Sequence, residues 1–91
     1  MERVKVYEAL DSERAYQESR WRPENNPQSK YFHSFEEWFT YMENYMDEAR
    51  HILSREADAV AEPKAAAIMR KVTAMGVAAL EQHGCTRREG F

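Results

Sequence analysis

Hydrophobic and polar positions follow the spacing of an amphipathic helix between residues 34 and 55. At about 100° per residue, the apolar side chains fall on one face that is wide enough to contact two neighbouring helices. Ser34 is followed three residues later by Glu37, the spacing of a capping box at a helix start. We therefore predict a helix over about residues 34–57 and expect the rest of the chain to pack against it. Its apolar face comprises Phe35, Trp38, Phe39, Tyr41, Met42, Tyr45, Met46, Ala49, Ile52 and Leu53.

A second amphipathic pattern spans residues 63–83. Proline is favoured at the first position of a helix and glycine just after the last, so Pro63 and Gly84 mark the expected ends, with Gly84 as an αL cap. Ala66, Thr73 and Val77 form a small, weakly polar second side, which indicates contact with another subunit. A short connection between the two helices predicts an antiparallel helical hairpin. The predicted inner face of residues 63–83 comprises Met75, Ile68, Ala79, Val72, Ala65, Gly76, Met69 and Leu80.

The N-terminal third predicts a further helix over about residues 2–20, with a candidate break at Asp11 and Ser12. The alternation in residues 3–7 leaves a short strand as the alternative, but no partner strand is evident elsewhere. Residues 21–33 are rich in proline and asparagine and are predicted to be a loop. The chain is therefore predicted to be a single all-α domain, residues 1–91, with three helices.

Aromatic and methionine residues are more numerous than such a small core requires. The chain has 91 residues, of which five are Tyr, four Phe, two Trp and five Met. A domain of this size buries only about 60–65% of its unfolded surface. Self-association would cover the remaining apolar side chains, so we expect a homo-oligomer.

Charge and cysteine content limit the partners and the compartment. The net charge of −3 argues against non-specific DNA or RNA binding, which depends on a basic surface. The chain shows no signal peptide and no apolar run near 18 residues, so no membrane partner is expected. Its single cysteine, Cys85, excludes an internal disulfide and is consistent with a cytoplasmic protein.

Three acidic residues, Glu36, Glu43 and Asp47, share one flank of the helix predicted over residues 34–57. Such a stripe suits Mg²⁺, which prefers oxygen ligands. We favour a solvated acidic face, because a hard-cation site usually draws carboxylates from more than one element. Where a second set of carboxylates would be needed, the helix predicted over residues 63–83 has Arg70 and Lys71. We therefore predict no metal and no other cofactor, with Mg²⁺ at these three acids as the alternative.

The histidines do not have metal-ligand spacing. His83 falls on the inner face of its predicted helix near the C-terminus, where a hydrogen-bonded core or cap histidine is expected. Cys85 follows a glycine and has no evident base partner, so it is interpreted as an unreactive thiol.

A cation–aromatic cluster lies at the end of the first predicted helix. Such a cluster can stack a nucleobase and pair with phosphate, although a tryptophan that anchors the loop, with arginines across it, explains the same pattern. A neighbouring subunit could add further cations. The candidate ligand-binding residues are Tyr16, Arg20, Trp21, Arg22, Lys30, Arg70 and Lys71.

Three runs of sequence carry a resemblance to a known group: SERAYQESRW at residues 12–21, HSFEEWFTYMENYMDEAR at 33–50 and IMRKVTAMGVAALEQHG at 68–84. They resemble small phage and prophage proteins that are similar to MazG-type all-α nucleotide pyrophosphohydrolases. Those enzymes hold Mg²⁺ with a Glu-Glu-x-x-Glu helix and a Glu-x-x-Asp helix in a dimeric bundle. Glu36 and Glu37 match the first pair, but the third acid is replaced by Thr40 and no Glu-x-x-Asp occurs in residues 63–83. The resemblance implies a helical bundle and a nucleotide ligand.

Together these observations predict a non-catalytic, phage-type nucleotide-binding protein in the cytoplasm of a bacterial host. By analogy with small helical phage proteins that act as sponges, its ligand would be a small, cyclic signalling nucleotide of host immunity. One alternative is a Mg²⁺-dependent, MazG-like nucleotide pyrophosphohydrolase. Another is a module that binds a host protein.

Overall fold

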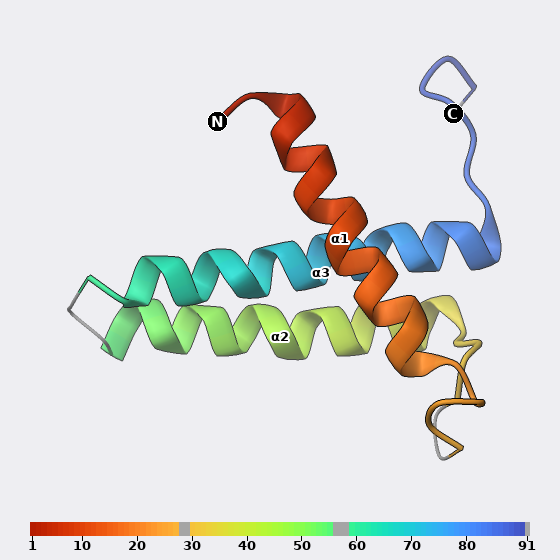
Figure 1. Cartoon of the computed structure of the whole chain (residues 1–91), viewed down its shortest axis with the longest axis horizontal. Coiled ribbons are helices and arrows are strands. Elements are labelled where there is room, and N and C mark those ends of the chain that lie inside the picture. The colour runs from red at the N-terminus through yellow and green to blue at the C-terminus, as the bar shows by residue number, and fades with distance from the viewer. Residues whose placement is uncertain (28–29, 56–58, 91) are drawn as a thin grey trace.

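The computed structural model describes residues 1–27, 30–55 and 59–90, and this part of the chain contains three helices and no strand (Figure 1). The helices are α1 (Arg3–Trp21), α2 (Phe35–Arg55) and α3 (Ala61–His83). The all-α prediction is confirmed, and the alternative strand at residues 3–7 is excluded because these residues are in α1. The predicted extension of α2 to about residue 57 lies outside the described residues.

Helix α1 continues through the candidate break without interruption. The Ser12 hydroxyl donates a hydrogen bond of 2.7 Å to the Ala9 carbonyl oxygen, on its own helix, and so does not start a second segment. The helix ends at Trp21, and the backbone of the following residue, Arg22, is extended at φ −61° and ψ 134°. Arg22 precedes Pro23, and proline disfavours the helical conformation in the residue before it.

The start of α2 is the capping box that the sequence predicts. Glu37 N donates a 3.1 Å hydrogen bond to the Ser34 hydroxyl, and Ser34 N donates a 2.9 Å hydrogen bond to a Glu37 carboxylate oxygen. The prediction is confirmed. These two bonds also set the direction in which the chain enters α2, because they join its first turn to the preceding loop.

The ends of α3 differ in detail from the prediction. Pro63 is the third helical residue and not the first, because α3 begins at Ala61. The N–H groups of the first turn have no acceptor within the helix, so proline is tolerated at each of these positions. Gly84 has φ 83° and ψ 160°, a region open essentially only to glycine, instead of the predicted αL conformation. Its N–H donates a 2.7 Å hydrogen bond to the Leu80 carbonyl oxygen.

Helix α3 lies at the centre of the fold. It packs along α2, and α1 crosses over one face of it (Figure 1), whereas the α1 and α2 backbones do not come together within the described ranges. The expectation that the rest of the chain packs against residues 34–57 is confirmed for α3. Helix α1 instead packs mainly on α3 and reaches α2 through the contact of Trp21 with Trp38. Small side chains explain why α1 packs on α3, because Ala74 (0% exposed) and Ala78 (1%) let a second helix approach α3 closely. Met69 and Leu80, predicted to face inward, are 52% and 43% exposed.

The core is small and centres on Trp38, which is 2% exposed. It packs with Met75, Ala78 and Ala79, and three partly buried side chains surround this group. Those three are Trp21, Met42 and Tyr45. In the described part of the chain, no helix has the length and apolar character needed to cross a membrane.

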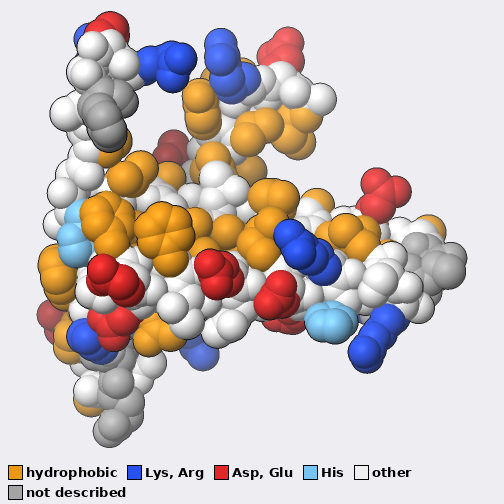
Figure 2. Space-filling view, turned by 180° about the vertical axis from the view of Figure 1, so that it is seen from behind, with side chains coloured by type: hydrophobic (Ala, Val, Ile, Leu, Met, Phe, Trp, Pro, Cys, Tyr) orange, Lys and Arg blue, Asp and Glu red, His pale blue; other side chains and the backbone are white. Residues whose placement is uncertain are grey.

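A row of hydrophobic side chains remains uncovered on the face of α2 and α3 opposite α1. Figure 2 shows this row from behind, with acidic side chains along one edge. Phe39 is 63% exposed and Phe35 is 39% exposed. Two adjoining hollows of about 630 and 210 Å³ run along the row between the helices. We call this surface the apolar face; its exposed and half-buried side chains are Phe35, Phe39, Met42, Met46, Met69 and Leu80.

Candidate ligand-binding site

The structure separates the residues of the predicted cation–aromatic cluster. Arg20 and Trp21 are consecutive residues of α1, yet they line different hollows. Successive helical side chains point about 100° apart, so two adjacent residues rarely serve one small site. Tyr16 lies beside Arg20, Lys30 lies beside Trp21, and Arg70 borders a third hollow between α1 and α3.

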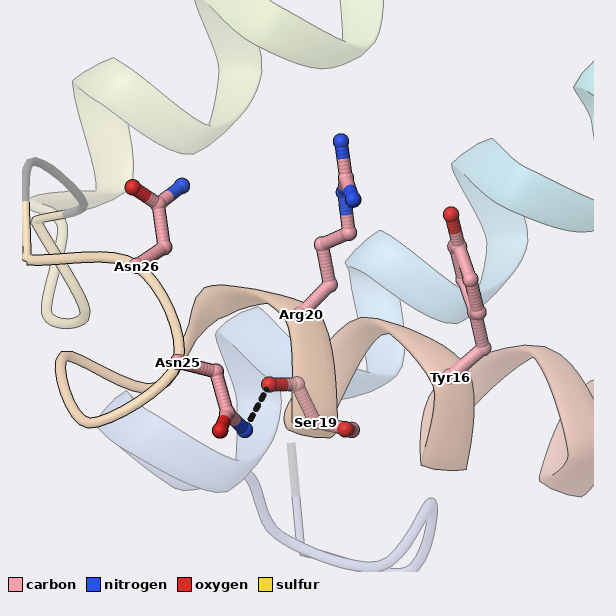
Figure 3. Close-up of a pocket in the computed structure, with 5 residues that line it drawn as sticks. All are labelled: Tyr16, Ser19, Arg20, Asn25 and Asn26. Atoms are coloured by element: carbon pink, nitrogen blue, oxygen red, sulfur yellow. Dashed lines mark hydrogen bonds between the residues drawn. The ribbon is translucent and has the colours of Figure 1, made fainter.

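The hollow beside Arg20, which we call the Arg20 hollow, has a volume of about 490 Å³ and is lined by Tyr16, Ser19, Arg20, Asn25 and Asn26. Figure 3 shows the side chains of Tyr16 and Arg20 projecting from α1 toward the same side, with Asn26 on that side too. The Tyr16 side chain is 61% exposed. An aromatic ring, a guanidinium and a carboxamide thus surround one open space.

The turn after α1 positions the two asparagines. The backbone N–H groups of Asn25 and Asn26 each donate a 2.9 Å hydrogen bond to the Arg22 carbonyl oxygen. The Asn25 side-chain amide donates a 2.6 Å hydrogen bond to the carbonyl oxygen of Ser19 (Figure 3). That carbonyl belongs to the last turn of α1, where backbone acceptors lack helical partners. Asn25 therefore fastens the turn to the helix end.

Arg22 belongs to an ion-pair network and not to an open site. Its guanidinium lies 2.5 Å from a Glu18 carboxylate oxygen and 5.0 Å from the centre of the Tyr31 ring. Glu18 also accepts hydrogen bonds of 2.6 Å from Tyr31 and from Arg14. The Tyr31 hydrogen bond, followed by Arg14 and then Arg22, holds the pKa of Glu18 below its ordinary value. The same hydrogen bond raises the pKa of Tyr31.

Three other predicted cations also have partners. Lys30 lies 3.0 Å from a Glu37 carboxylate oxygen, and Arg70 lies 2.7 Å from one of Glu13. The Lys71 ammonium lies 4.1 Å from the centre of the Tyr45 ring.

Arg20 differs from these residues. Within residues 1–27, 30–55 and 59–90 its side chain has no hydrogen-bond, ion-pair or ring partner. Of the seven candidate residues, it is the cation whose charge the described residues leave uncompensated. A guanidinium in this state can bind an incoming anion without first breaking an ion pair.

The acidic stripe of α2 does not gather acids from a second helix. Glu36, Glu43 and Asp47 are all exposed, and the described residues contain no group of three or more His, Cys, Asp or Glu side chains placed to hold a metal ion. Glu43 and Asp47 border a hollow that also contains Arg50 and several apolar side chains. The stripe therefore forms an edge of the apolar face.

Gln82 is a structurally important residue that the sequence did not single out. Its Oε1 accepts hydrogen bonds from the backbone N–H of His33 at 3.1 Å and from Trp38 Nε1 at 3.0 Å. Its Nε2 donates a 2.8 Å hydrogen bond to the Tyr31 carbonyl oxygen. His83 Nε2 lies 2.7 Å from the His33 carbonyl oxygen, and its ring stacks on Phe35 at 4.3 Å. The end of α3 thus holds the loop before α2, and the prediction of a hydrogen-bonded His83 is confirmed.

Glu18 is another residue that the sequence analysis missed. Its spacing of four residues from both Arg14 and Arg22 is the signal that could have found it, because oppositely charged side chains at i,i+4 meet on a helix surface. Gln17 offered no such signal. It is 1% exposed and donates a 3.0 Å hydrogen bond to the Lys71 carbonyl oxygen, which joins α1 to α3.

Comparison with protein-family models, with curated proteins and with solved structures finds no match for this chain.

Proposed function

We propose that this chain is a non-catalytic nucleotide-binding protein that holds a small signalling nucleotide without hydrolysing it. The observation that carries the proposal is the uncompensated guanidinium of Arg20 beside the exposed ring of Tyr16. A nucleotide needs a cation for its phosphate and an aromatic face for its base. The two residues are one helical turn apart and point toward the same side, so one ligand can contact both.

The dimensions and lining of the Arg20 hollow agree with this ligand class. Its volume of about 490 Å³ is within the range of small-molecule sites, which is about 300–1,000 Å³. The Asn26 side chain lies on the same side and can hydrogen-bond to a base edge, because a carboxamide both donates and accepts. Asn25 keeps the turn in place through Ser19.

The acidic stripe supports binding over hydrolysis. A Mg²⁺-dependent pyrophosphohydrolase needs carboxylates that converge on the phosphates. Glu36, Glu43 and Asp47 all lie on α2. Where α3 would have to supply further carboxylates, it has the basic residues Arg70 and Lys71. Arg70 already pairs with Glu13. The three acidic residues of the stripe do not line the Arg20 hollow.

We further propose that α2 and α3 form an antiparallel helical hairpin that assembles as a homo-oligomer through the apolar face. Exposed patches of this kind are rare on monomeric proteins and usually mark an interface. A small domain with one thin core gains stability by covering such a surface. The protein would act in the cytoplasm of a bacterial host, where the exposed thiol of Cys85 stays reduced.

The test is to incubate the protein with Mg²⁺ and a panel of linear and cyclic nucleotides, and then to denature it and analyse the released ligand. We expect the ligand to be recovered intact. Arg20→Ala should weaken its binding by about ten- to a hundredfold, whereas Arg3→Ala, an exposed cation on the same helix, should not. Glu43→Gln should have little effect.

Monophosphate or pyrophosphate products that disappear in Glu43→Gln would overturn the proposal in favour of the hydrolase. Binding that Arg3→Ala and Arg20→Ala weaken equally would show that only general electrostatics attract the nucleotide, and this would remove the site at Tyr16 and Arg20.

A further inference from the structure

The Arg20 hollow offers a ligand one positive charge. Among the described residues that line it, Arg20 is the one with a charged side chain. The two neighbouring cations of α1 are not available, because Arg14 and Arg22 both pair with Glu18. No carboxylate lines the described part of the hollow either, so the charge of Arg20 is not cancelled where a ligand would meet it.

The lining also limits what could hold the outer phosphates of a nucleoside triphosphate. Proteins that bind a triphosphate chain usually surround it with backbone N–H groups, a lysine and a Mg²⁺ ion held by protein oxygens. The described residues contain no group of three or more His, Cys, Asp or Glu side chains placed to hold a metal ion. Phosphates beyond the first would therefore stay in solvent, where interactions with a distant charge are screened.

Tyr16 and Arg20 are spaced for one nucleotide unit. Side chains four residues apart on a helix are neighbours, with about 5–6 Å between their Cβ atoms, and these two project toward the same side (Figure 3). Tyr16 is 61% exposed, so a base can reach its ring. The guanidinium of Arg20 presents its N–H groups as a planar fork that matches two oxygens of one phosphate. A base on Tyr16 therefore brings the phosphate of its own ribose to Arg20.

We infer that the Arg20 hollow recognises one nucleoside joined to one singly charged phosphate, as in a phosphodiester, and gains no affinity from further phosphates or from a metal ion. A phosphodiester carries one negative charge, which one guanidinium balances. A terminal phosphate carries about −1.5 to −2 at pH 7, so part of its charge would have no partner among the described lining residues. The inference rests on the proposed function, because it specifies the part of the nucleotide that the same site contacts.

The test compares adenosine, cyclic AMP, AMP and ATP in titrations followed by NMR, with EDTA present. Adenine serves as the probe because stacking on an aromatic ring tolerates any base. We expect the three phosphorylated ligands to bind within about threefold of one another, with cyclic AMP at least as tight as ATP. Adenosine should bind about ten- to a hundredfold more weakly, because it lacks the phosphate.

Variants separate the charge from the ring. Arg20→Ala should lower the affinity for the three phosphorylated ligands to that for adenosine, whereas Arg3→Ala, at an exposed position of the same helix, should leave it unchanged. Tyr16→Ala removes the aromatic face and should weaken all four ligands about tenfold. Tyr16→Phe keeps the ring and should bind normally, and circular dichroism verifies that each variant is folded.

Two kinds of failure can be told apart. ATP that binds about tenfold or more tightly than cyclic AMP, or Arg20-dependent binding that requires Mg²⁺, would overturn the inference and leave the proposed function standing. If none of these nucleotides showed Arg20-dependent binding up to about 10 mM, the inference and the proposed function would both be overturned.

Discussion

The side-chain oxygen of Gln82 accepts the hydrogen bond of the Trp38 indole at 3.0 Å, so the last turn of α3 satisfies the polar atom of the largest core residue. The indole N–H would otherwise be buried without a partner, because Trp38 is 2% exposed. The same glutamine holds the backbone on both sides of Phe32. One side chain therefore joins the core, the loop and α3.

We expect Gln82→Leu to lower the free energy of unfolding by about 2–4 kcal/mol, because it removes three hydrogen bonds and leaves the Trp38 indole unsatisfied. Gln82→Glu keeps the acceptor for Trp38 and His33 but not the donor to Tyr31, and should cost less. Urea denaturation measures both values. A loss below about 0.5 kcal/mol for Gln82→Leu, typical of an ordinary surface substitution, would show that water replaces these bonds.

Trp38→Ala should lower the free energy of unfolding by about 3–5 kcal/mol, since it removes a fully buried ring from a small core. That is a large part of the stability of a domain of this size. Trp38→Phe retains most of the apolar contact but not the hydrogen bond to Gln82. Its free energy of unfolding should therefore lie between those of Trp38→Ala and the native chain. Chemical denaturation followed by circular dichroism separates the three proteins. If Trp38→Ala cost less than about 1 kcal/mol, the core would not depend on this ring.

Stability should fall in two steps as the pH is lowered. Burial lowers the pKa of His33 from its ordinary 6.5, so the folded state binds a proton less readily than the unfolded chain, and stability falls as the pH drops below about 6.5. The Ser34 backbone, and then Lys30, lower the pKa of Glu37 from 4.5 to about 2. The contribution of the Glu37 carboxylate to stability is therefore present above pH 4.5 and is lost between pH 4.5 and about 2.

The two steps can be assigned by melting temperatures measured across the pH range. His33→Phe should flatten the change just below pH 6.5, and Glu37→Gln should flatten the change below pH 4.5. Unaltered pH profiles in these variants would contradict the assignment.

A charge on the apolar face should separate the proposed oligomer before it unfolds the monomer. Phe39→Glu and Leu80→Glu place the charge at positions of the apolar face that are 63% and 43% exposed. Asn44→Glu adds the same charge at another exposed position of α2 and is the control. Light scattering should give a mass above 10.7 kDa for the native chain and the control, and a smaller assembly for the variants.

A native mass of 10.7 kDa at micromolar concentration would refute self-association. The apolar face would then be a surface that binds a different protein. That result would favour the alternative function, a module that binds a host protein.

The helices could be predicted because their signals are local. The apolar spacing of α2 and the Ser34–Glu37 capping box depend only on residues within a few turns, and both are present in the structure. The candidate binding site was only partly predictable. Tyr16 and Arg20 share one hollow as expected, but Trp21 points elsewhere, although the one-residue spacing on a helix already implied different directions.

The sequence by itself determined the three helices, the cap of α2 and the excess of apolar side chains, because backbone propensity and periodicity act over a few residues. Only the tertiary structure decided that α3 and not α2 is central, since this depends on whether Ala74 and Ala78 admit a crossing helix. It also decided which cations are free. Arg70 meets Glu13 across 57 positions of sequence, and Gln82 reaches Trp38 across 44. No local pattern encodes such distances, because they arise only when helices pack.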